Sequence, residues 1–188
     1  MKNIAIVYFS GFGHTKKIAE HIKAGIDDTK DVFASLISVD ELNDSGILNE
    51  YDAIVFGAPT YMGSVPWQFK KFMDEASKIW INKSWKDKLA AGFTNSGSLS
   101  GDKFNVLMQL CTFACQQGMI WLSLGVDNTS GTDGIDSGHS EALNRMGSSL
   151  GLMTQSENDS PENTPPTGDK RTAELFGQRI AYFVRRLS

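Results

Sequence analysis

The chain has 188 residues, of which 40% are hydrophobic and 21% are charged, a composition typical of one globular domain over residues 1–188. Its 18 basic and 22 acidic side chains give a formal net charge of −4. We therefore expect neither nucleic acid nor an anionic membrane surface as the main partner, because basic surfaces bind both. The first residues already have a strand pattern, so we expect no signal segment and a cytoplasmic protein.

Strand-like and helix-like segments alternate along the chain. Residues 4–9 are apolar throughout, as expected of a strand that helices cover on both faces. The expected strands are residues 4–9, 31–39, 52–58, 88–94 and 119–124. The expected helices contain residues 18–26, start at Pro66, run over 102–117 and close the chain at 171–187. This alternation predicts an α/β fold with a five-stranded parallel sheet.

One segment, residues 127–169, does not fit the alternation, because it is rich in Gly, Ser, Asn, Asp and Thr. Such a long irregular stretch within a domain is usually functional or disordered. Within it, Met146–Met153 contains apolar residues that we expect to dock on the body and extend the sheet. Ser156–Gly168 is expected to be exposed and mobile.

The two cysteines, Cys111 and Cys115, lie four residues apart in a helical pattern and so share one face. They are interpreted as small buried apolar residues or as a CxxxC redox or metal site. Because no histidine or second cysteine pair completes a zinc-type spacing, we predict no metal site.

The loop after the first strand has the composition of an anion-binding turn. Its two glycines allow a tight turn, and the next helix begins inside it, so that free backbone N–H groups favour a phosphate. The P-loop pattern is absent, and Lys16 replaces the third glycine of a dinucleotide fingerprint. An ordinary βα turn is the alternative. The candidate residues are Ser10, Gly11, Phe12, Gly13, His14 and Thr15.

Two further loops follow the third and fourth strands and are expected at the same edge of the sheet, where open α/β sheets bind ligands. Tyr61 and Met62 would cover a flat group, and the polar loop after the fourth strand suits the edge of a heteroaromatic ring. The candidates are Pro59, Thr60, Tyr61, Met62 and Gly63 from the first of these loops, and Thr94, Asn95, Ser96 and Gly97 from the second.

With these loops in place, the chain resembles the flavodoxin-like superfamily. Within it, the chain is similar to NAD(P)H:quinone oxidoreductases of the tryptophan-repressor-binding-protein type and to NADPH-dependent FMN reductases. The resemblance implies a doubly wound sheet with strand order 2-1-3-4-5 and FMN as cofactor, with its phosphate on the first loop and its ring on the other two. It rests on residues 10–15, 51–60, 68–74, 88–97 and 118–120.

The resemblance also implies roles for single residues. Phe12 stands where the family often has a tyrosine near the nicotinamide nucleotide, and Trp80 matches a tryptophan on the substrate side of the flavin. Gln117 replaces a histidine that contacts the flavin, and Tyr61 replaces an arginine. Asn144–Gly151 falls where the family has a loop that closes over the site.

We therefore expect an enzyme that passes electrons from NADH or NADPH through FMN to a quinone or similar flat acceptor. The flavin carries the chemistry, and His14 is the one ionisable candidate in the three loops. The family implies a homodimer or homotetramer, for which Trp67, Phe69, Trp80 and Trp85 are candidate contacts. The alternatives are a flavodoxin-type electron carrier between protein partners and a nucleotide-binding regulator without redox activity.

Overall fold

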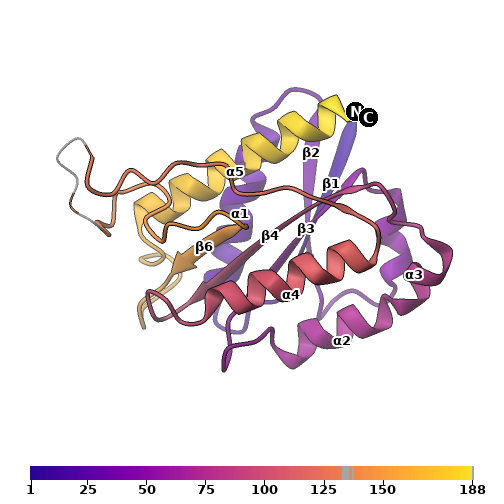
Figure 1. The fold of residues 1–188 in the computed structure, drawn as a ribbon, viewed down its shortest axis with the longest axis horizontal. Coiled ribbons are helices and arrows are strands. Elements are labelled where there is room, and N and C mark those ends of the chain that lie inside the picture. Colours follow the sequence, from indigo (N-terminus) through magenta and orange to yellow (C-terminus); the bar gives the residue numbers. More distant parts are fainter. Residues whose placement is uncertain (133–135, 137, 188) are drawn as a thin grey trace.

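The protein forms a parallel sheet with the strand order β2-β1-β3-β4-β5, and a short sixth strand also pairs with β4 (Figure 1). The computed structural model describes residues 1–132, 136 and 138–187. The predicted α/β fold and strand order are confirmed. The strands are β1 (Lys2–Tyr8), β2 (Val32–Ser38), β3 (Ala53–Pro59), β4 (Leu89–Ser96), β5 (Ile120–Trp121) and β6 (Leu152–Gln155).

Helices cover both faces of the sheet. One face packs against the first and last helices, and the opposite face packs against the other three (Figure 1). In the part of the chain that is described, no helix has both the length and the apolar character needed to cross a bilayer. The helices are α1 (His14–Asp27), α2 (Trp67–Glu75), α3 (Ser77–Asn82), α4 (Lys103–Gln116) and α5 (Thr167–Arg186), with a 3₁₀ turn at Ser45–Glu50.

The apolar run in β1 explains how the sheet is buried. Ile4 and Ile6 belong to the core beneath α1 and α5, whereas Ala5 and Val7 belong to the core beneath α2 and α4. Successive side chains of a strand point to opposite faces, so a strand buried on both sides is apolar at every position. All the strands run in the same direction, which brings the loops after β1, β3 and β4 to one edge, as the sequence predicts.

The fifth strand is shorter than predicted. Only Ile120–Trp121 pair with β4, next to Leu89 and Ala90, instead of residues 119–124. Further along β4, the edge position belongs to β6, whose first residue Leu152 pairs with Phe93. The chain therefore leaves the edge after β5 and returns to it as β6. This confirms that the Met146–Met153 region docks and extends the sheet, although the strand itself begins at Leu152.

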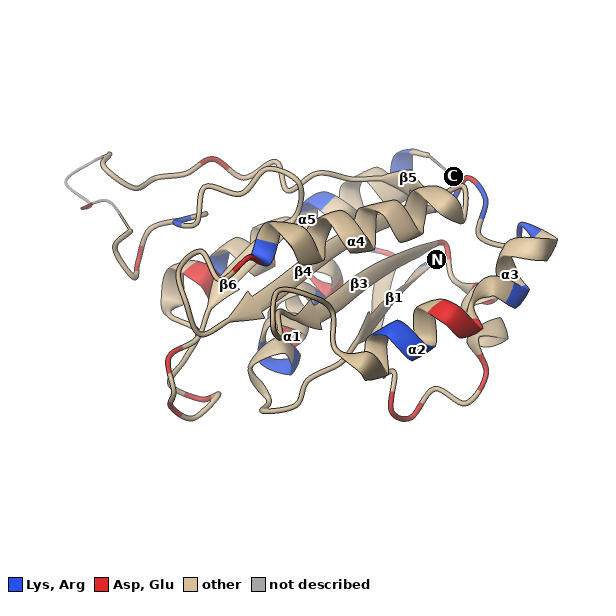
Figure 2. Ribbon diagram, turned by 60° about the horizontal axis from the view of Figure 1, so that its bottom comes forward, with Lys and Arg blue, Asp and Glu red and all other residues tan. Residues whose placement is uncertain are grey.

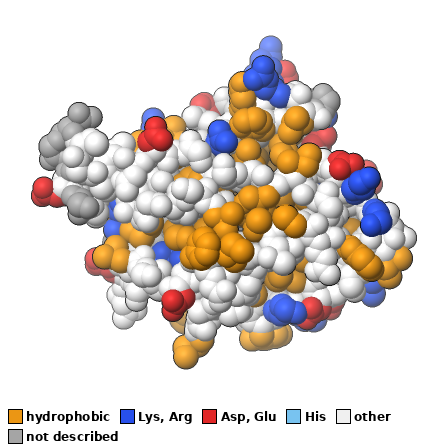
Figure 3. Space-filling view, in the orientation of Figure 1, with side chains coloured by type: hydrophobic (Ala, Val, Ile, Leu, Met, Phe, Trp, Pro, Cys, Tyr) orange, Lys and Arg blue, Asp and Glu red, His pale blue; other side chains and the backbone are white. Residues whose placement is uncertain are grey.

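The outer face of α4 carries no charge and exposes apolar side chains. Phe104 is 60% exposed and Met108 is 42% exposed, and Figure 3 shows hydrophobic side chains near the middle of the face on which α4 lies. Cys115 is exposed and Cys111 is half-buried, so the interpretation of both cysteines as buried apolar residues is wrong. Burial and the neighbouring Cys115 thiol raise the pKa of Cys111 to about 11, which makes it a weak nucleophile.

Candidate functional site

The loop after β1 forms the start of α1. Gly13 caps the helix with a φ of 89°, a left-handed conformation that glycine adopts without strain. The backbone N–H of Lys16 donates to Ser10 Oγ at 3.1 Å, and Thr15 is almost completely buried. The capping residue Gly13 has no side chain that could bond the first N–H groups of α1. The loop therefore offers backbone amides and hydroxyls to an anion at the positive end of a helix dipole.

The loop after β3 is a two-residue turn that places an aromatic ring beside the first loop. Tyr61 and Ser64 exchange two backbone hydrogen bonds of 3.0 Å, and both Met62 and Gly63 have positive φ, as a tight turn of this kind requires. The rings of Phe12 and Tyr61 meet edge to face with centroids 6.3 Å apart. Burial raises the pKa of Tyr61, and the backbone amide of Gly11, which faces the Tyr61 hydroxyl, opposes this rise.

Buried hydroxyl and amide groups fix the loop after β4. The hydroxyl groups of Thr60 and Thr94 are 2.9 Å apart, and the backbone N–H of Thr60 donates to the carbonyl of Asn95 at 2.8 Å. The side-chain oxygen of Asn95 accepts bonds from Thr154 at 2.8 Å and from Ser156 at 3.0 Å. These bonds join the ends of β3, β4 and β6 into one frame.

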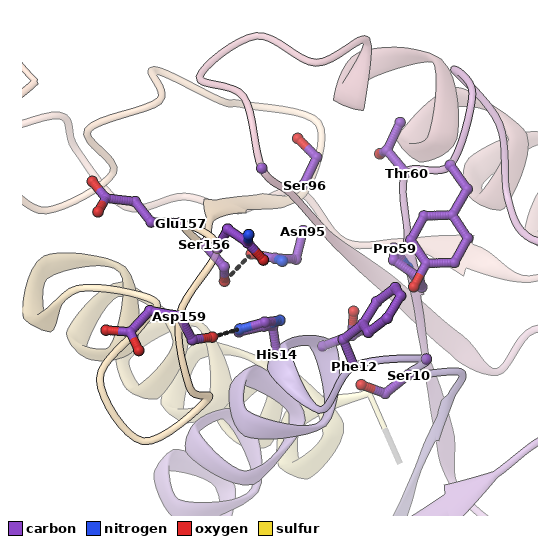
Figure 4. A pocket seen from close by; sticks show the side chains of 15 residues that line it. Ser10, Phe12, His14, Pro59, Thr60, Asn95, Ser96, Ser156, Glu157 and Asp159 are labelled. Carbon is purple, nitrogen blue, oxygen red and sulfur yellow. Dashed lines mark hydrogen bonds between the residues drawn. The ribbon is translucent and has the colours of Figure 1, made fainter.

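A fourth segment, Ser156–Asp159, completes the site and was missed by the sequence analysis. It follows β6, and Figure 4 shows Ser156 directed at Asn95 and the Asp159 carbonyl directed at His14. The prediction that Ser156–Gly168 is exposed is wrong at both ends, because Ser156, Thr164 and Gly168 are buried. The missed signal was that these polar residues follow an apolar stretch that forms an edge strand.

The four segments enclose a cavity of about 440 Å³. Among the described residues, no lysine or arginine lines this cavity. Glu157 and Asp159 belong to its lining, but their carboxylates point outward, away from Asn95 and His14 (Figure 4). The backbone N–H of Ser160 holds the pKa of Asp159 below its usual range, so this group is ionised at neutral pH. The residues that line the cavity are Ser10, Gly11, Phe12, His14, Thr15, Pro59, Thr60, Tyr61, Asn95, Ser96, Gly97 and Ser156–Asp159.

The remaining loop candidates, Gly13, Met62, Gly63 and Thr94, do not line the cavity. Gly13 and Thr94 support it, since Gly13 starts α1 and Thr94 bonds Thr60. Met62 and Gly63 form the tip of the second turn, and Met62 is fully exposed. They therefore shape the site or border it.

Two residues that the resemblance assigns to the flavin, Gln117 and Trp80, instead lie near the N-terminal ends of the strands, whereas the cavity lies at their C-terminal ends. Gln117 is buried before β5 begins, and its amide donates to the Ala76 carbonyl at 3.1 Å. Trp80 lies in α3, on the chain that returns to the start of β4, and is 46% exposed (Figure 1). Parallel strands separate these residues from the cavity, so one chain does not bring them to a flavin.

Two other expectations also need correction. Asn144–Gly151 does not line the cavity, and the Asn144 amide donates to the carbonyls of Val126 and Ser148. Phe69 and Trp85 are fully buried in the core, so they cannot serve as oligomer contacts.

The residues present fit FMN. The backbone amides at the start of α1 and the hydroxyls of Ser10 and Thr15 suit its phosphate, and the loops after β3 and β4 offer an aromatic ring and polar backbone groups to a flat ring system. Within the described part of the chain, the lining holds no lysine or arginine, so backbone amides and hydroxyls are the donors it offers to an anion.

The fold and this cavity define an α/β flavoprotein of the flavodoxin type. Residues 5–112 match the family model described as a flavodoxin domain. The chain is 41% identical over 194 residues to the flavodoxin FldP of Pseudomonas aeruginosa, covering 100% of this chain and 99% of that protein. The chain therefore belongs to the flavodoxin family, whose fold binds FMN.

Two further relatives bear on function. A flavodoxin, WrbA-like protein from Agrobacterium tumefaciens has a solved structure with a TM-score of 0.77 and 37% identity, covering 100% of both chains. An NAD(P)H dehydrogenase (quinone) from Geobacter sulfurreducens is 27% identical and covers 84% of this chain and 90% of its own length. These relatives support the resemblance to the tryptophan-repressor-binding-protein type.

Proposed function

We propose that this protein binds FMN and carries electrons between protein partners. FMN would supply the redox chemistry, while the chain binds the phosphate, orients the ring and presents one edge of it to a partner. The observation that carries this proposal is the charge around the cavity, where Glu157 and Asp159 stand at the exposed side without a lining lysine or arginine.

This distribution of charge favours a basic protein over a nicotinamide nucleotide. NADH and NADPH bring a diphosphate toward the site, and the two carboxylates repel it. The two lysines on α2 do not make the helix after the second loop a basic surface. Lys70 and Lys71 pair with Asp74 and Glu75 at 2.5 and 3.8 Å, so the two basic and two acidic side chains of α2 balance each other (Figure 2).

The second candidate is the NAD(P)H-dependent FMN reductase that acts on a quinone or another flat acceptor. One observation favours it: Phe12 is 76% exposed beside Tyr61, and such a pair suits stacking with a nicotinamide or quinone ring. The quinone dehydrogenase relative from Geobacter sulfurreducens supports it too. Under this candidate, Phe12 and Tyr61 orient the incoming ring.

Stopped-flow absorbance distinguishes the two candidates. The chain is loaded with FMN and mixed with NADH or NADPH, with and without benzoquinone; separately, dithionite-reduced protein is mixed with cytochrome c, a basic one-electron acceptor. A carrier reduces cytochrome c at a rate that falls as salt rises, and NAD(P)H bleaches its flavin negligibly. Bleaching by NAD(P)H at about 1 s⁻¹ or faster, with turnover of benzoquinone, would instead establish the reductase.

A matched pair of variants tests the charge argument itself. Glu157→Gln with Asp159→Asn should weaken the salt dependence of cytochrome c reduction. Glu75→Gln, which removes an exposed carboxylate away from the cavity, should leave it unchanged. If both variants behave like the parent, the acidic side of the cavity plays no part in docking.

We also propose that the chain forms a homo-oligomer through the outer face of α4. Phe104 and Met108 are exposed there, and the buried Lys103 is the single charged residue of this helix, so two copies would meet without charge repulsion. Size-exclusion chromatography with light scattering tests this. Phe104→Glu should convert an oligomer to a monomer, whereas Trp80→Glu on α3 should not; a monomeric parent would refute the proposal.

A further inference from the structure

A lysine is buried directly behind the loop that follows β4. Lys103 is 0% exposed, although it carries a side chain that water normally solvates. It is also the first residue of α4, where the helix dipole disfavours a cation. Burial lowers its pKa to about 8, which leaves most of the side chain protonated at neutral pH. The fold therefore keeps a cation at an unfavourable position.

The ammonium group holds the wall of the cavity. Its Nζ donates to Ser96 Oγ at 2.8 Å and to the carbonyl oxygen of Ser98 at 2.5 Å, and Ser96 itself lines the cavity. Gly101 packs against the same serine so closely that a Cβ there would lie 2.4 Å from Ser96 Oγ. Lys103 thus fixes the turn between β4 and α4 from behind.

A buried ion pair supports the same loop from its other side. Arg145 Nε lies 2.8 Å from Asp169 Oδ1, with the two side chains 5% and 2% exposed. Gln155 accepts from Arg145 at 2.8 Å, donates its backbone N–H to Asp169 at 2.8 Å and donates its amide to the Gly97 carbonyl at 3.0 Å. The Ser98 carbonyl is therefore held by Lys103 directly, and the Gly97 carbonyl is held by Gln155, which the ion pair of Arg145 and Asp169 orients.

The balance of charge behind the loop is positive. Lys103 interacts electrostatically with both Asp169 and Arg145, so two cations and one anion share this buried region. Charges act more strongly in a protein interior than in water. Their field therefore reaches the cavity side of the loop, where it favours an occupant that gains negative charge.

We propose that Lys103 is a positioning residue that fixes the loop of residues 96–98 and raises the reduction potential of the flavin bound against it. The proposal rests on the proposed FMN-dependent function. Two-electron reduction at neutral pH transfers two electrons from the donor protein and one proton from water to the flavin, and the ring is left with one additional negative charge. Lys103 stabilises that charge through the loop, so reduced FMN binds more tightly than it would without the lysine.

Two substitutions of Lys103 and one matched control test the proposal. Lys103→Met keeps the length and removes the charge, and Lys103→Arg keeps the charge. Lys88→Met is the control, because Lys88 also donates to two backbone carbonyls, of Asn49 and Tyr51, but does so at the opposite edge of the sheet. The midpoint potential of bound FMN and the dissociation constant of oxidised FMN are measured for each variant.

We expect Lys103→Met to lower the ratio of reduced to oxidised FMN affinity by about tenfold, which corresponds to about 30 mV for a two-electron couple. Lys103→Arg should retain most of the parent potential, and Lys88→Met all of it. An unchanged potential in Lys103→Met, or an equal shift in Lys88→Met, would overturn the electrostatic role. If Lys103→Met does not fold, Lys103→Gln replaces it in the same comparison.

Hydrogen exchange of the FMN-free chain separates failure of this proposal from failure of the proposed function. Amides of residues 96–101 should exchange about tenfold faster in Lys103→Met and at the parent rate in Lys88→Met, because one buried bond network is lost in the first variant alone. A parent that never binds FMN would refute the proposed function, and exchange would still report on the loop. Equal exchange in all three proteins would overturn the positioning role.

Discussion

The Nε2 atom of His14 lies 2.8 Å from the backbone carbonyl oxygen of Asp159, although the two residues are 145 positions apart in the chain. This contact ties the start of α1 to the segment that follows β6. The ion pair between Lys17 and Glu162, at 2.9 Å, joins the same two regions one turn further along the helix. The start of α1 and the acidic segment, residues 157–163, are therefore held together by two contacts.

His14→Ala should loosen the acidic segment. The loss of one exposed hydrogen bond to a carbonyl should cost about 1 kcal/mol locally, so amides of residues 157–163 should exchange roughly fivefold faster. His21→Ala is the control, because His21 lies on the same helix as His14 but away from the cavity, where it contacts Glu174 of α5 at 3.0 Å. Hydrogen exchange by mass spectrometry provides the measurement, and equal protection in the two variants would contradict the contact.

The hydroxyls of the first loop should contribute strongly to FMN affinity. Ser10→Ala with Thr15→Ala removes two donors to a charged phosphate, each of which contributes about 1.5–3 kcal/mol when bonded. We expect the dissociation constant of FMN to rise at least about 100-fold, as measured by flavin fluorescence.

Ser35→Ala, on the exposed side of β2, is the control for these hydroxyls and should bind FMN like the parent. If the double variant bound FMN as tightly as the parent, this loop would not be the phosphate-binding site.

The sheet and three of the site loops could be predicted because their signals are local. A run such as Ile4–Phe9, apolar at every position, occurs where helices bury both faces of a strand. Once the parallel strands are placed, topology alone brings the loops of residues 10–15, 59–63 and 94–97 to one edge. No contact between distant side chains needs to be known for this step.

The remaining features depend on contacts between distant segments. Ser156 enters the site because it bonds Asn95, 61 residues earlier, and no local pattern in its polar surroundings indicates this. From the sequence, Lys103 has the pattern of a solvated residue at the start of a helix. In the structure it is fully buried next to the turn at Gly101. Gln117 and Trp80 were assigned to the flavin through the resemblance, which gave no information on the edge of the sheet at which this chain places them.

Close packing of α1 against α5 should make Gly177 sensitive to substitution. A Cβ there would lie 2.2 Å from the Ile22 carbonyl oxygen, and the backbone carbonyl of a helix cannot move aside at low cost. Gly177→Ala should therefore destabilise the fold by about 1–3 kcal/mol, despite the better helix propensity of alanine. Gln178→Ala, at the adjacent exposed position, should change the urea midpoint little; a Gly177→Ala variant as stable as the parent would contradict this packing.

The burial of Lys103 predicts that stability depends on pH in the alkaline range. Its pKa is lowered to about 8 from an ordinary value of 10.5, so between these values the unfolded chain holds a proton that the folded chain has released. The unfolding free energy then rises with pH, by at most about 1.4 kcal/mol per pH unit from this group. Below pH 8 both states are protonated, and the contribution becomes constant.

Urea unfolding at intervals between about pH 7 and 10 isolates this effect as the parent stability minus that of Lys103→Met. The difference should increase with pH above about 8 because the methionine does not titrate. Lys30→Met, which alters an exposed lysine, should give a flat difference over the same range. A Lys103 difference that stayed flat or fell with rising pH would mean that this ammonium is solvated, and the buried cation behind the loop would have to be abandoned.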